Sequence, residues 1–422
     1  MAITDRHANH RGKPPSRIGA LRNRNFRLFW LGQTISLVGT WMQTIGLSWL
    51  VYQVSGSAVA LGVVMAVQFL PLLVLAPLGG LLADHYPKRW ILVATQSASI
   101  VPALCLWGLA SWSGTQVWEL ALTAAFLGTI NAFDNPARQA FVMDMVGPSD
   151  LLNAIALNSG AFNAAQVLGP AIAGVLIAFL GIRTTFFCNA ISFLPVIAAL
   201  LAMRGLPQTK SAVAEGPWRR LAGGAAYVRG EPQVALVLIA VSGFSLFAMN
   251  RMTLMPIFAK QVLDSGSQGF GFLMAAGGLG ALLGAISLAV LRLRGPSGRL
   301  QFASGMVALA SMFAFAISRN LLLSLVLLML VGFFQIWFLA VSNTRIQVAV
   351  PNALRGRVMA IYSQGLLGVT PVGSLLAGAL AAAWGAPASL AIGAALAAAV
   401  LVAIAATRPW LFELGNLGLP GA

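Results

Sequence analysis

Charge is the first thing that this chain of 422 residues lacks. Asp, Glu, Lys and Arg together make up 9% of it, whereas roughly 25% is usual in soluble proteins. Apolar residues make up 59%, and the mean hydropathy is +0.85. Because so few charges cannot cover a globular surface, the composition predicts an integral membrane protein.

Cysteine and histidine are also scarce. Cys105 and Cys188 each stand within an apolar run, so neither a disulfide framework nor a paired-cysteine site is expected. His7 and His10 lie in the N-terminal tail and His85 stands alone, so they form no ligand cluster. We therefore expect no metal and no cofactor. The phosphate-binding pattern Gly, four residues, Gly-Lys-Ser/Thr is missing too, which argues against ATP as the energy source.

Long apolar runs take the place of these features. A helix needs about 20 mostly apolar residues to cross a bilayer. Twelve runs have roughly this length: 28–53, 58–82, 90–112, 117–135, 151–180, 184–203, 233–258, 268–291, 301–317, 321–343, 358–384 and 388–407.

The longest connection, 204–232, divides these runs into two sets of six, and "LGPAIAGVL" at 168–176 recurs loosely as "VTPVGSLLAGAL" at 369–380. Two related six-span halves are a recurring transporter plan, with the substrate bound near the midplane. We therefore predict an all-α integral membrane fold with twelve transmembrane helices in two pseudo-symmetric six-helix halves. The predicted parts are a tail (1–27), the first half (28–203), a central loop with an interfacial helix (204–232), the second half (233–407) and a second tail (408–422).

Basic residues outnumber acidic residues by 26 to 10, and their positions predict the orientation. With the N-terminus inside, 22 of the 26 bases fall on inner segments, among them Arg138, Arg345, Arg355 and Arg357. This bias follows the positive-inside rule, so we expect an inner or plasma membrane protein with both termini in the cytoplasm. Bases spread over many loops do not form a nucleic-acid patch. The expected partners are the lipid bilayer and a small-molecule substrate, bound by a functional monomer.

Polar residues inside the spans are costly unless they face protein or water. The first span carries them at steps of three or four, as one stripe: Gln33, Ser36, Thr40, Gln43, Thr44 and Ser48. Such groups either hydrogen-bond between helices or line a wet cavity. On the second hypothesis the candidate cavity residues are Gln33, Thr40, Gln43, Asn131, Asn163, Gln166, Arg251, Gln335 and Asn343.

Residues 79–90 read "GGLLADHYPKRW" and interrupt the apolar sequence with one acid and two bases. The stretch resembles the cytoplasmic loop 2–3 signature of the major facilitator superfamily: Gly, three residues, Asp, a base, any residue, Gly and two bases. The matching residues are Gly80, Asp84, Lys88 and Arg89. His85 replaces the usual base and Pro87 the usual glycine. The resemblance implies the superfamily's fold and transport by alternating access.

In that superfamily the Asp faces the N-terminal end of helix 11, which begins here near 354–360. A helix N-terminus carries about half a positive charge and attracts a carboxylate. Asp84 would thus latch the two halves together on the cytoplasmic side, next to Arg355 and Arg357. The alternative is that these charges only set the topology.

The same gate is expected to include Asp134, at the inner end of the fourth span. Its partner would be Lys88, Arg89 or Arg138, and the sequence leaves the choice open.

Span 5 is similar to a glycine-rich run of antiporters in this superfamily, through Gly169, Pro170 and Gly174. Ordinary packing of small residues is the alternative. Four stretches, 25–57, 131–142, 151–174 and 355–378, resemble a branch of siderophore exporters, the enterobactin type among them, and drug exporters. Gln166 departs from this branch, where relatives often carry an arginine.

The resemblance implies a secondary active exporter of a siderophore or a drug-like amphipathic molecule, driven by proton antiport. The proton-coupling candidates are few, because only Glu119 and Asp134 lie in or near spans. An ion-independent facilitator, an importer of another small molecule, and a channel or signalling protein are the alternatives. An enzyme is not expected, because the spans contain no histidine and almost no carboxylate.

Arg251, in "FAMNRMTLMP", lies within the seventh span toward its outer end. Its side chain could extend to the outer surface, which removes most of the cost of a charge in the membrane. It could instead point into the cavity and bind carboxylate or catecholate oxygens in a bidentate manner.

Overall fold

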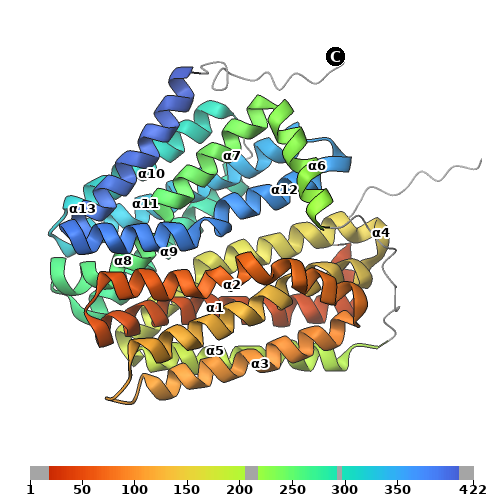
Figure 1. Cartoon of the computed structure of the whole chain (residues 1–422), viewed down its shortest axis with the longest axis horizontal. Helices are drawn as coiled ribbons and strands as arrows, with labels where there is room; N and C mark the ends of the chain where they lie inside the picture. Colours follow the sequence, from red (N-terminus) through yellow and green to blue (C-terminus); the bar gives the residue numbers. More distant parts are fainter. Residues whose placement is uncertain (1–18, 205–216, 292–296, 408–422) are drawn as a thin grey trace, which may run out of the picture.

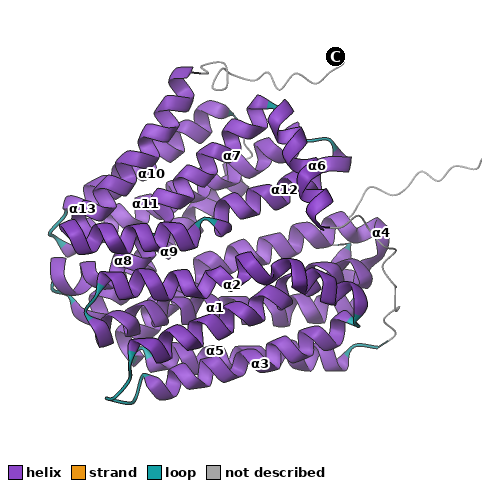
Figure 2. Cartoon of the chain, in the orientation of Figure 1, coloured by secondary structure: helices purple, strands orange, loops and turns teal. Residues whose placement is uncertain are grey.

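The computed structural model describes residues 19–204, 217–291 and 297–407, and every regular element in those ranges is helical (Figure 2). The helices form two bundles that lie side by side (Figure 1). The first bundle contains η1 (Ala20–Arg22), α1 (Arg24–Ser55), α2 (Ala58–His85), α3 (Lys88–Leu109), α4 (Val117–Leu180) and α5 (Arg183–Ala202). The second contains α6 (Pro217–Gly230), α7 (Pro232–Phe244), η2 (Ser245–Met249), α8 (Arg251–Ile257), η3 (Phe258–Val262), α9 (Gly266–Leu291), α10 (Gly298–Ile317), α11 (Leu321–Ala349), α12 (Asn352–Ser363), η4 (Gln364–Gly368) and α13 (Thr370–Thr407).

The ends of α1 follow from local sequence. The Asn23 side chain accepts hydrogen bonds from the backbone N–H groups of Asn25 and Phe26, which have no partner within the helix. At the other end Gly56 has φ 61°, a left-handed conformation that glycine adopts without strain. The Ser57 hydroxyl then caps α2 through the N–H of Ala60 at 3.3 Å. The two-residue connection therefore folds α1 and α2 into a helical hairpin.

Glycines on one side of α1 allow α5 to approach closely. Gly32, Gly39 and Gly46 recur every seven residues and thus lie on one face. A Cβ atom on Gly32 would lie 2.8 Å from the Cα of Val196, and one on Gly39 would lie 2.3 Å from the Ser192 hydroxyl. The close α1–α5 contact therefore depends on these small residues.

The long helix α4 contains two of the predicted spans. Its first arm (117–146) runs parallel to α2, because Gly128 lies against Gln68 and Ala132 lies against Gly79. Its second arm (153–180) runs parallel to α1, where Leu157 accepts from the Trp30 indole and Gly169 packs on Trp41. Since α1 and α2 are antiparallel, the arms run in opposite directions, as two successive spans must.

The second bundle contains interrupted helices. The predicted seventh span consists of α7, η2, α8 and η3, so two π-helical segments break its regular hydrogen bonding. The predicted eleventh span contains a third such segment, η4. Within α13, Gly385 has φ 85° and ends the eleventh span where the sequence predicts a break.

Hydropathy of the described helices supports a membrane protein. Nine stretches are long and apolar enough to cross a bilayer, and the last of them, Leu354–Thr407, has 54 residues and includes the break at Gly385. α1 is not among the nine because its polar stripe lowers its hydropathy. The all-α membrane architecture is confirmed, whereas the count of twelve spans stays a prediction.

The interfacial helix expected in the central loop is α6. A Cβ atom on Gly224 would lie 3.1 Å from the Arg357 carbonyl oxygen, so α6 packs on α12. The Tyr227 hydroxyl donates to the carbonyl oxygen of Ala349 at 3.4 Å, at the end of α11. The side chains of Trp218 and Leu221, in the first part of α6, lie outside those that the structure describes. The helix α6 of the central loop thus packs on the second bundle.

The two bundles share contacts along α2 and α13. These helices are antiparallel, because Gly62 lies against Ser374 whereas Leu73, further along α2, lies near Gly368. The end of α2 therefore points toward the start of α12, where α6 packs. We call this end of the molecule the α6 end and the other the opposite end.

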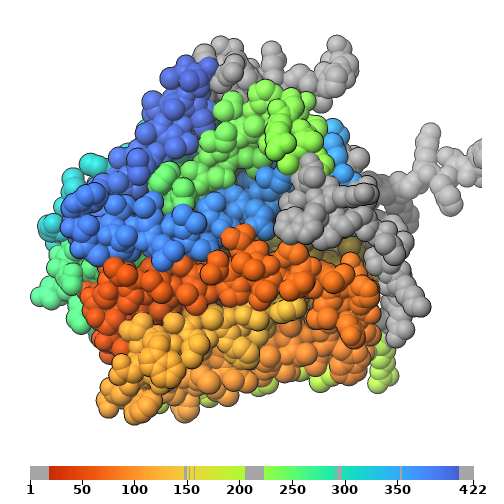
Figure 3. Space-filling view, in the orientation of Figure 1, coloured from red at the N-terminus to blue at the C-terminus, as the bar shows by residue number. Residues whose placement is uncertain are grey.

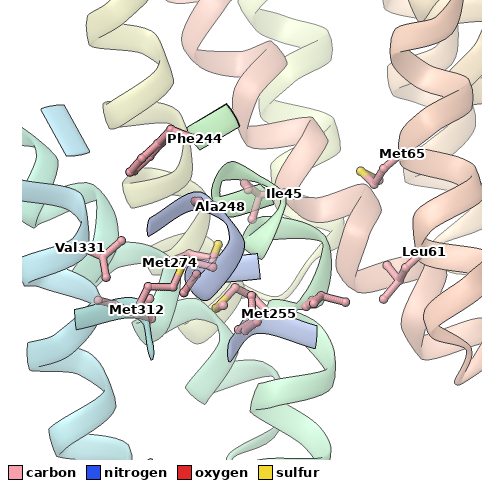
Figure 4. Packing of buried hydrophobic residues seen from close by; sticks show 14 of the residues in the cluster. Ile45, Leu61, Met65, Phe244, Ala248, Met255, Met274, Met312 and Val331 are labelled. Carbon is pink, nitrogen blue, oxygen red and sulfur yellow. The ribbon is translucent and has the colours of Figure 1, made fainter. Parts of the chain in front are cut away.

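Among the described residues, the apolar core joins the bundles at the opposite end. One cluster of buried residues extends from the later part of α1 and the start of α2 through the second bundle. Figure 4 labels its members Ile45 and Leu61 of the first bundle and Ala248, Met255, Met274 and Met312 of the second. At the α6 end the first bundle has a separate cluster, which includes Phe26, Phe29 and Leu92. The boundary between the bundles runs across the molecule in Figure 3.

Close backbone contacts mark the same region. A Cβ atom on Gly62 of α2 would lie 2.6 Å from the Ser374 carbonyl oxygen of α13. On the other side of the contact, a Cβ atom on Gly174 would lie 2.2 Å from the Gly271 carbonyl oxygen of α9. The bundles thus touch through glycines of both halves, and we call the α2–α13 contact the glycine seam.

Candidate functional site

The predicted latch residues lie at the α6 end, at the end of α2. Asp84 is exposed and makes no hydrogen bond or ion pair with any residue that the structure describes. A Cβ atom on Gly80 would meet nothing within 4 Å. The predicted close contact of this helix with helix 11 is therefore not made in this conformation.

The two bases of the motif bind within the first bundle. Lys88 pairs with Asp144 at 2.7 Å, and Arg89 donates to the carbonyl oxygen of Leu201 at 3.0 Å. Both contacts hold the start of α3 to neighbouring helices. Neither base pairs with Asp134. The two sequence hypotheses that made Lys88 or Arg89 its partner therefore do not describe this conformation.

The predicted partners on helix 11 are placed by α12. Arg357 lies against α6, where its Nη1 would be 2.6 Å from a Cβ atom on Gly223. Arg355 is half-buried, and its Nε atom is buried without a hydrogen-bond partner in the described part of the chain. Neither arginine is bonded to Asp84 in this structure.

Asp134 stands at the centre of a buried polar network in the first bundle. Its carboxylate is 3.0 Å from the Arg138 guanidinium, one helical turn on, and accepts from Thr95 and Gln96 of α3 at 2.8 Å each. Gln96 in turn accepts from the Ser36 hydroxyl of α1 at 3.0 Å. Asp134 is 2% exposed. The network links α1, α3 and α4 around a buried carboxylate that has several hydrogen-bond partners.

A related arrangement occurs in the second bundle. Arg345 of α11 donates to the Gln301 amide oxygen of α10 at 2.5 Å, and the same amide donates to Ser342 at 2.7 Å. Both Arg138 and Arg345 are buried, at 7% and 4% exposed. The prediction that they belong to inner loops was wrong, because both lie within helices, where Arg138 pairs with Asp134 and Arg345 bonds to Gln301 of α10.

The polar stripe of α1 lies mostly between helices. Gln43 accepts from Asn189 of α5 at 2.7 Å, and Thr44 accepts from Gln68 of α2 at 3.0 Å. Gln33 is 3% exposed. Thr40 bonds to the Ser36 carbonyl oxygen and is half-buried. Of the two sequence hypotheses, hydrogen bonding between helices describes this stripe in this conformation.

The second arm of α4 instead presents polar groups to the outside. Ser159 and Asn163 are exposed and Gln166 is half-buried. At 100° per residue, Asn163 lies on the side of the helix opposite Ile172, which begins the exposed apolar face. Exposed polar groups within a span require water. Asn163 and Gln166 therefore fit the predicted wet surface.

The remaining cavity candidates are divided between exposure and burial. Gln335 of α11 is 8% exposed, and its Oε1 atom has no hydrogen-bond partner among the described residues. Asn343, one turn from the end of α11, is half-buried and accepts from Gln347. Asn131 is half-buried on the first arm of α4.

Arg251 opens α8, directly after a break in the helix. Asn250 has φ −73° and ψ 2°, and its side chain bonds back to the Leu246 carbonyl oxygen and across to Ser374 of α13. Arg251 itself is 7% exposed. Its side chain therefore does not extend to the outer surface, which was one of the two predicted positions.

The interrupted segments bind each other. The Ser245 hydroxyl of η2 donates to the Leu366 carbonyl oxygen of η4 at 2.5 Å. A π-helical turn releases a carbonyl oxygen from the regular pattern, and such turns are common at functional sites. The second bundle thus carries a π-helical joint beside Arg251.

Aromatic contacts close the opposite end. The rings of Trp49 (α1) and Phe270 (α9) stack with centroids 4.9 Å apart. The Lys260 ammonium lies 5.8 Å from the Tyr52 ring centroid, again across the two bundles. Sequence reasoning missed these residues, because nothing in a local pattern distinguishes a closing aromatic from a core aromatic. Asp144, Thr95 and Gln96 were missed as well, although an acid or amide in an apolar run was a visible signal.

The proton-coupling candidates both have partners. Glu119 caps α4, where its carboxylate accepts from the Gln116 backbone N–H at 2.8 Å. Asp134 is held in the network above. The glycine motif of span 5 packs helices: Gly169 against Trp41 and Gly174 against Gly271.

Two apolar helical bundles joined at one end, with interrupted helices between them, are the architecture of a major facilitator superfamily transporter. The comparisons with known proteins agree. The family described as transmembrane secretion effector matches residues 15–414. The chain therefore belongs to this family of the superfamily.

Relatives of known activity lie within the predicted branch. The staphyloferrin A transporter of Staphylococcus aureus is 26% identical over 357 residues, which are 83% of this chain and 88% of that protein. The multidrug efflux pump Tap of Mycolicibacterium fortuitum is 28% identical over 394 residues, or 90% and 95% of the two chains. The predicted resemblance to siderophore and drug exporters is thus confirmed as a likeness.

Among solved structures, a bacterial homologue of the human lysosomal transporter Spinster shares the fold. Its inward-facing, unoccupied form has a TM-score of 0.69 and 13% identity, and the match covers 95% of this chain and 97% of that one.

Proposed function

We propose that the protein is a secondary active exporter that carries an amphipathic small molecule, a siderophore or a drug-like compound, out of the cytoplasm by alternating access. The observation that carries the proposal is the asymmetry of contact between the bundles. They share an apolar core and a glycine seam at the opposite end, while toward the α6 end Asp84 and Asn163 are exposed and a Cβ atom on Gly80 would meet nothing within 4 Å. The likeness to a siderophore transporter and a multidrug pump supports the substrate class.

The orientation follows from charge. The α6 end contains described bases such as Lys88, Arg89 and Arg357, which the positive-inside rule assigns to the cytoplasm. In that orientation the end at which the bundles share no apolar core faces the cytoplasm, from which an exporter must collect its substrate. We further propose that the protein acts as a monomer in the plasma membrane.

Proton antiport is the proposed energy source, with Asp134 as the acid. Protonation of its carboxylate would end the attraction to Arg138 and loosen the contacts among α1, α3 and α4. A specific observation favours a second candidate, an ion-independent facilitator: Glu119 and Asp134 already have bonded partners in the described chain.

Inside-out membrane vesicles test these proposals directly. An imposed proton gradient, acidic inside, should drive uptake of a lipophilic dye such as Hoechst 33342 to a concentration above that outside. A proton ionophore should abolish the accumulation. Saturable uptake that only equalises the concentrations, with or without the ionophore, would identify a facilitator, and absence of uptake of every amphipathic probe would contradict export.

Replacing Asp84 with asparagine should leave the fold intact but lower the transport rate about tenfold. Asp84 has no bonded partner among the described residues, so the change should cost nothing in this conformation, whereas the charge is needed for the expected latch to helix 11. A cysteine placed at Ser159 reports opening at the α6 end, and its labelling by a maleimide should rise. Unchanged labelling together with unchanged transport would show that Asp84 only sets the topology.

A further inference from the structure

Arg251 is a buried cation whose charge is not compensated within the described chain. Its side chain is 7% exposed, and the structure shows no hydrogen bond or ion pair from it to any described residue. An isolated charge in a low-dielectric interior is strongly unfavourable. We therefore expect the Arg251 guanidinium to bind an anionic group in another state of the protein.

The acids that the structure describes do not supply the counter-charge. Asp134 pairs with Arg138, Asp144 pairs with Lys88, and Glu119 caps α4. The other described acids, which form no ion pair with Arg251, are Asp84, Asp150, Glu231 and Asp264.

The surroundings of Arg251 suit a ligand. It begins α8, which packs against α1 and α2 of the first bundle as well as α13 of the second, so it lies where the bundles meet. The span is broken immediately before it at Asn250, and the π-helical joint lies next to it. Interrupted helices between the two halves are where transporters of this general plan bind their substrates.

We propose that Arg251 is the anion-recognising residue of the substrate site, and that the transported class is amphipathic organic anions that carry carboxylate or catecholate groups. The planar guanidinium matches two oxygens of such a group and stays charged in the membrane interior. The bound anion replaces the missing counter-charge, and the apolar part of the substrate rests on the surrounding apolar core. This inference rests on the proposed exporter function and names its substrate class.

Transport of three probes by wild type and Arg251→Gln tests the inference. The probes are anionic carboxyfluorescein, cationic ethidium and a neutral, lipophilic dye, Nile red. The variant should lower kcat/KM for carboxyfluorescein at least tenfold and change the values for the other two less than twofold. Arg251→Lys keeps the charge but not the planar pair of donors, so its kcat/KM for carboxyfluorescein should lie between those of wild type and Arg251→Gln. Arg183→Gln removes an exposed base of the first bundle, at the opposite end of the molecule, and should leave all three unchanged. An equal loss for all three probes would overturn the proposal.

A binding measurement separates this inference from the export proposal. Carboxyfluorescein should raise the Tm of the purified wild-type protein and leave that of Arg251→Gln unchanged. Without ligand the variant should have the higher Tm, because an uncompensated charge has been removed. If wild type binds the anion but transports no probe, export fails while the assignment of Arg251 stands. If wild type and variant are stabilised equally, or neither is, the assignment of Arg251 is wrong.

Discussion

Replacing Arg138 with leucine should destabilise the protein more than any other single change in the first bundle. The carboxylate of Asp134 would keep its bonds from Thr95 and Gln96 but lose its counter-charge while 2% exposed. Breaking a buried ion pair from one side costs about 3–5 kcal/mol. We expect most of the protein to be lost from membranes, and a free energy of unfolding in mixed micelles lower by that amount.

The double variant distinguishes a broken pair from a packing defect. Asp134→Leu together with Arg138→Leu removes both charges, and the replacement of a whole buried pair by apolar groups is often neutral. It should therefore be more stable than Arg138→Leu alone. The exchange Asp134→Arg with Arg138→Asp should recover part of the stability, because the two positions are one turn apart on one helix. A double variant no better than the single one would refute the ion pair as the source of the loss.

Lys88→Leu provides the comparison. The Lys88–Asp144 pair is also short, at 2.7 Å, but its side chains are 9% and 19% exposed and can be solvated when one partner is removed. Solvent-exposed pairs contribute about 0–1 kcal/mol, so this pair, whose acid is 19% exposed against 2% for Asp134, should lose less than the Asp134–Arg138 pair does. The difference in the free energy of unfolding between Arg138→Leu and Lys88→Leu therefore measures how much burial adds to the cost of breaking an ion pair.

The fold was largely predictable from the sequence, and for a physical reason. A helix needs about 20 mostly apolar residues to cross a bilayer, so the length of the apolar runs predicts the spans. The break at Gly385 and the helix in the central loop were predictable from turn residues and amphipathic spacing. The π-helical segments of η2, η3 and η4 were not, because they arise from contacts between helices such as Ser245 with Leu366.

The polar residues were predictable in kind but not in role. Sequence spacing placed Gln43 and Thr44 on a helical stripe, which exists, and named Asn163 as a cavity candidate. A stripe has the same period whether it faces a neighbouring helix or water, so the pattern cannot tell Gln43, bonded to Asn189, from exposed Asn163. The partner of Asp134 was also open from sequence. Lys88 was a candidate alongside Arg138, and only the packed helices show that Lys88 pairs with Asp144 and leaves Arg138 to Asp134.

Gly62→Leu should trap the protein with its opposite end open. A Cβ atom at this position would lie 2.6 Å from the Ser374 carbonyl oxygen, so the glycine seam cannot close around a larger side chain. Overpacking of this kind costs about 1–3 kcal/mol, and in a two-state equilibrium that shifts the ratio of conformations by roughly 5- to 150-fold. Gly80→Leu is the matched control, because a Cβ atom there meets nothing within 4 Å in this conformation.

Cysteine labelling at both ends compares the conformations of the Gly62→Leu and Gly80→Leu variants. In a background with Cys105 and Cys188 replaced by alanine, Ser159→Cys reports the α6 end and Ala381→Cys, which is 8% exposed in the apolar core, reports the opposite end. Gly62→Leu should raise labelling of Ala381→Cys about fivefold or more and reduce that of Ser159→Cys. Gly80→Leu should do the reverse, because it obstructs only the contact expected in the other state. Both should stop transport, since alternating access needs both closures. If Gly62→Leu left both positions labelled as in wild type, the seam would be a packing contact that the transport cycle never opens.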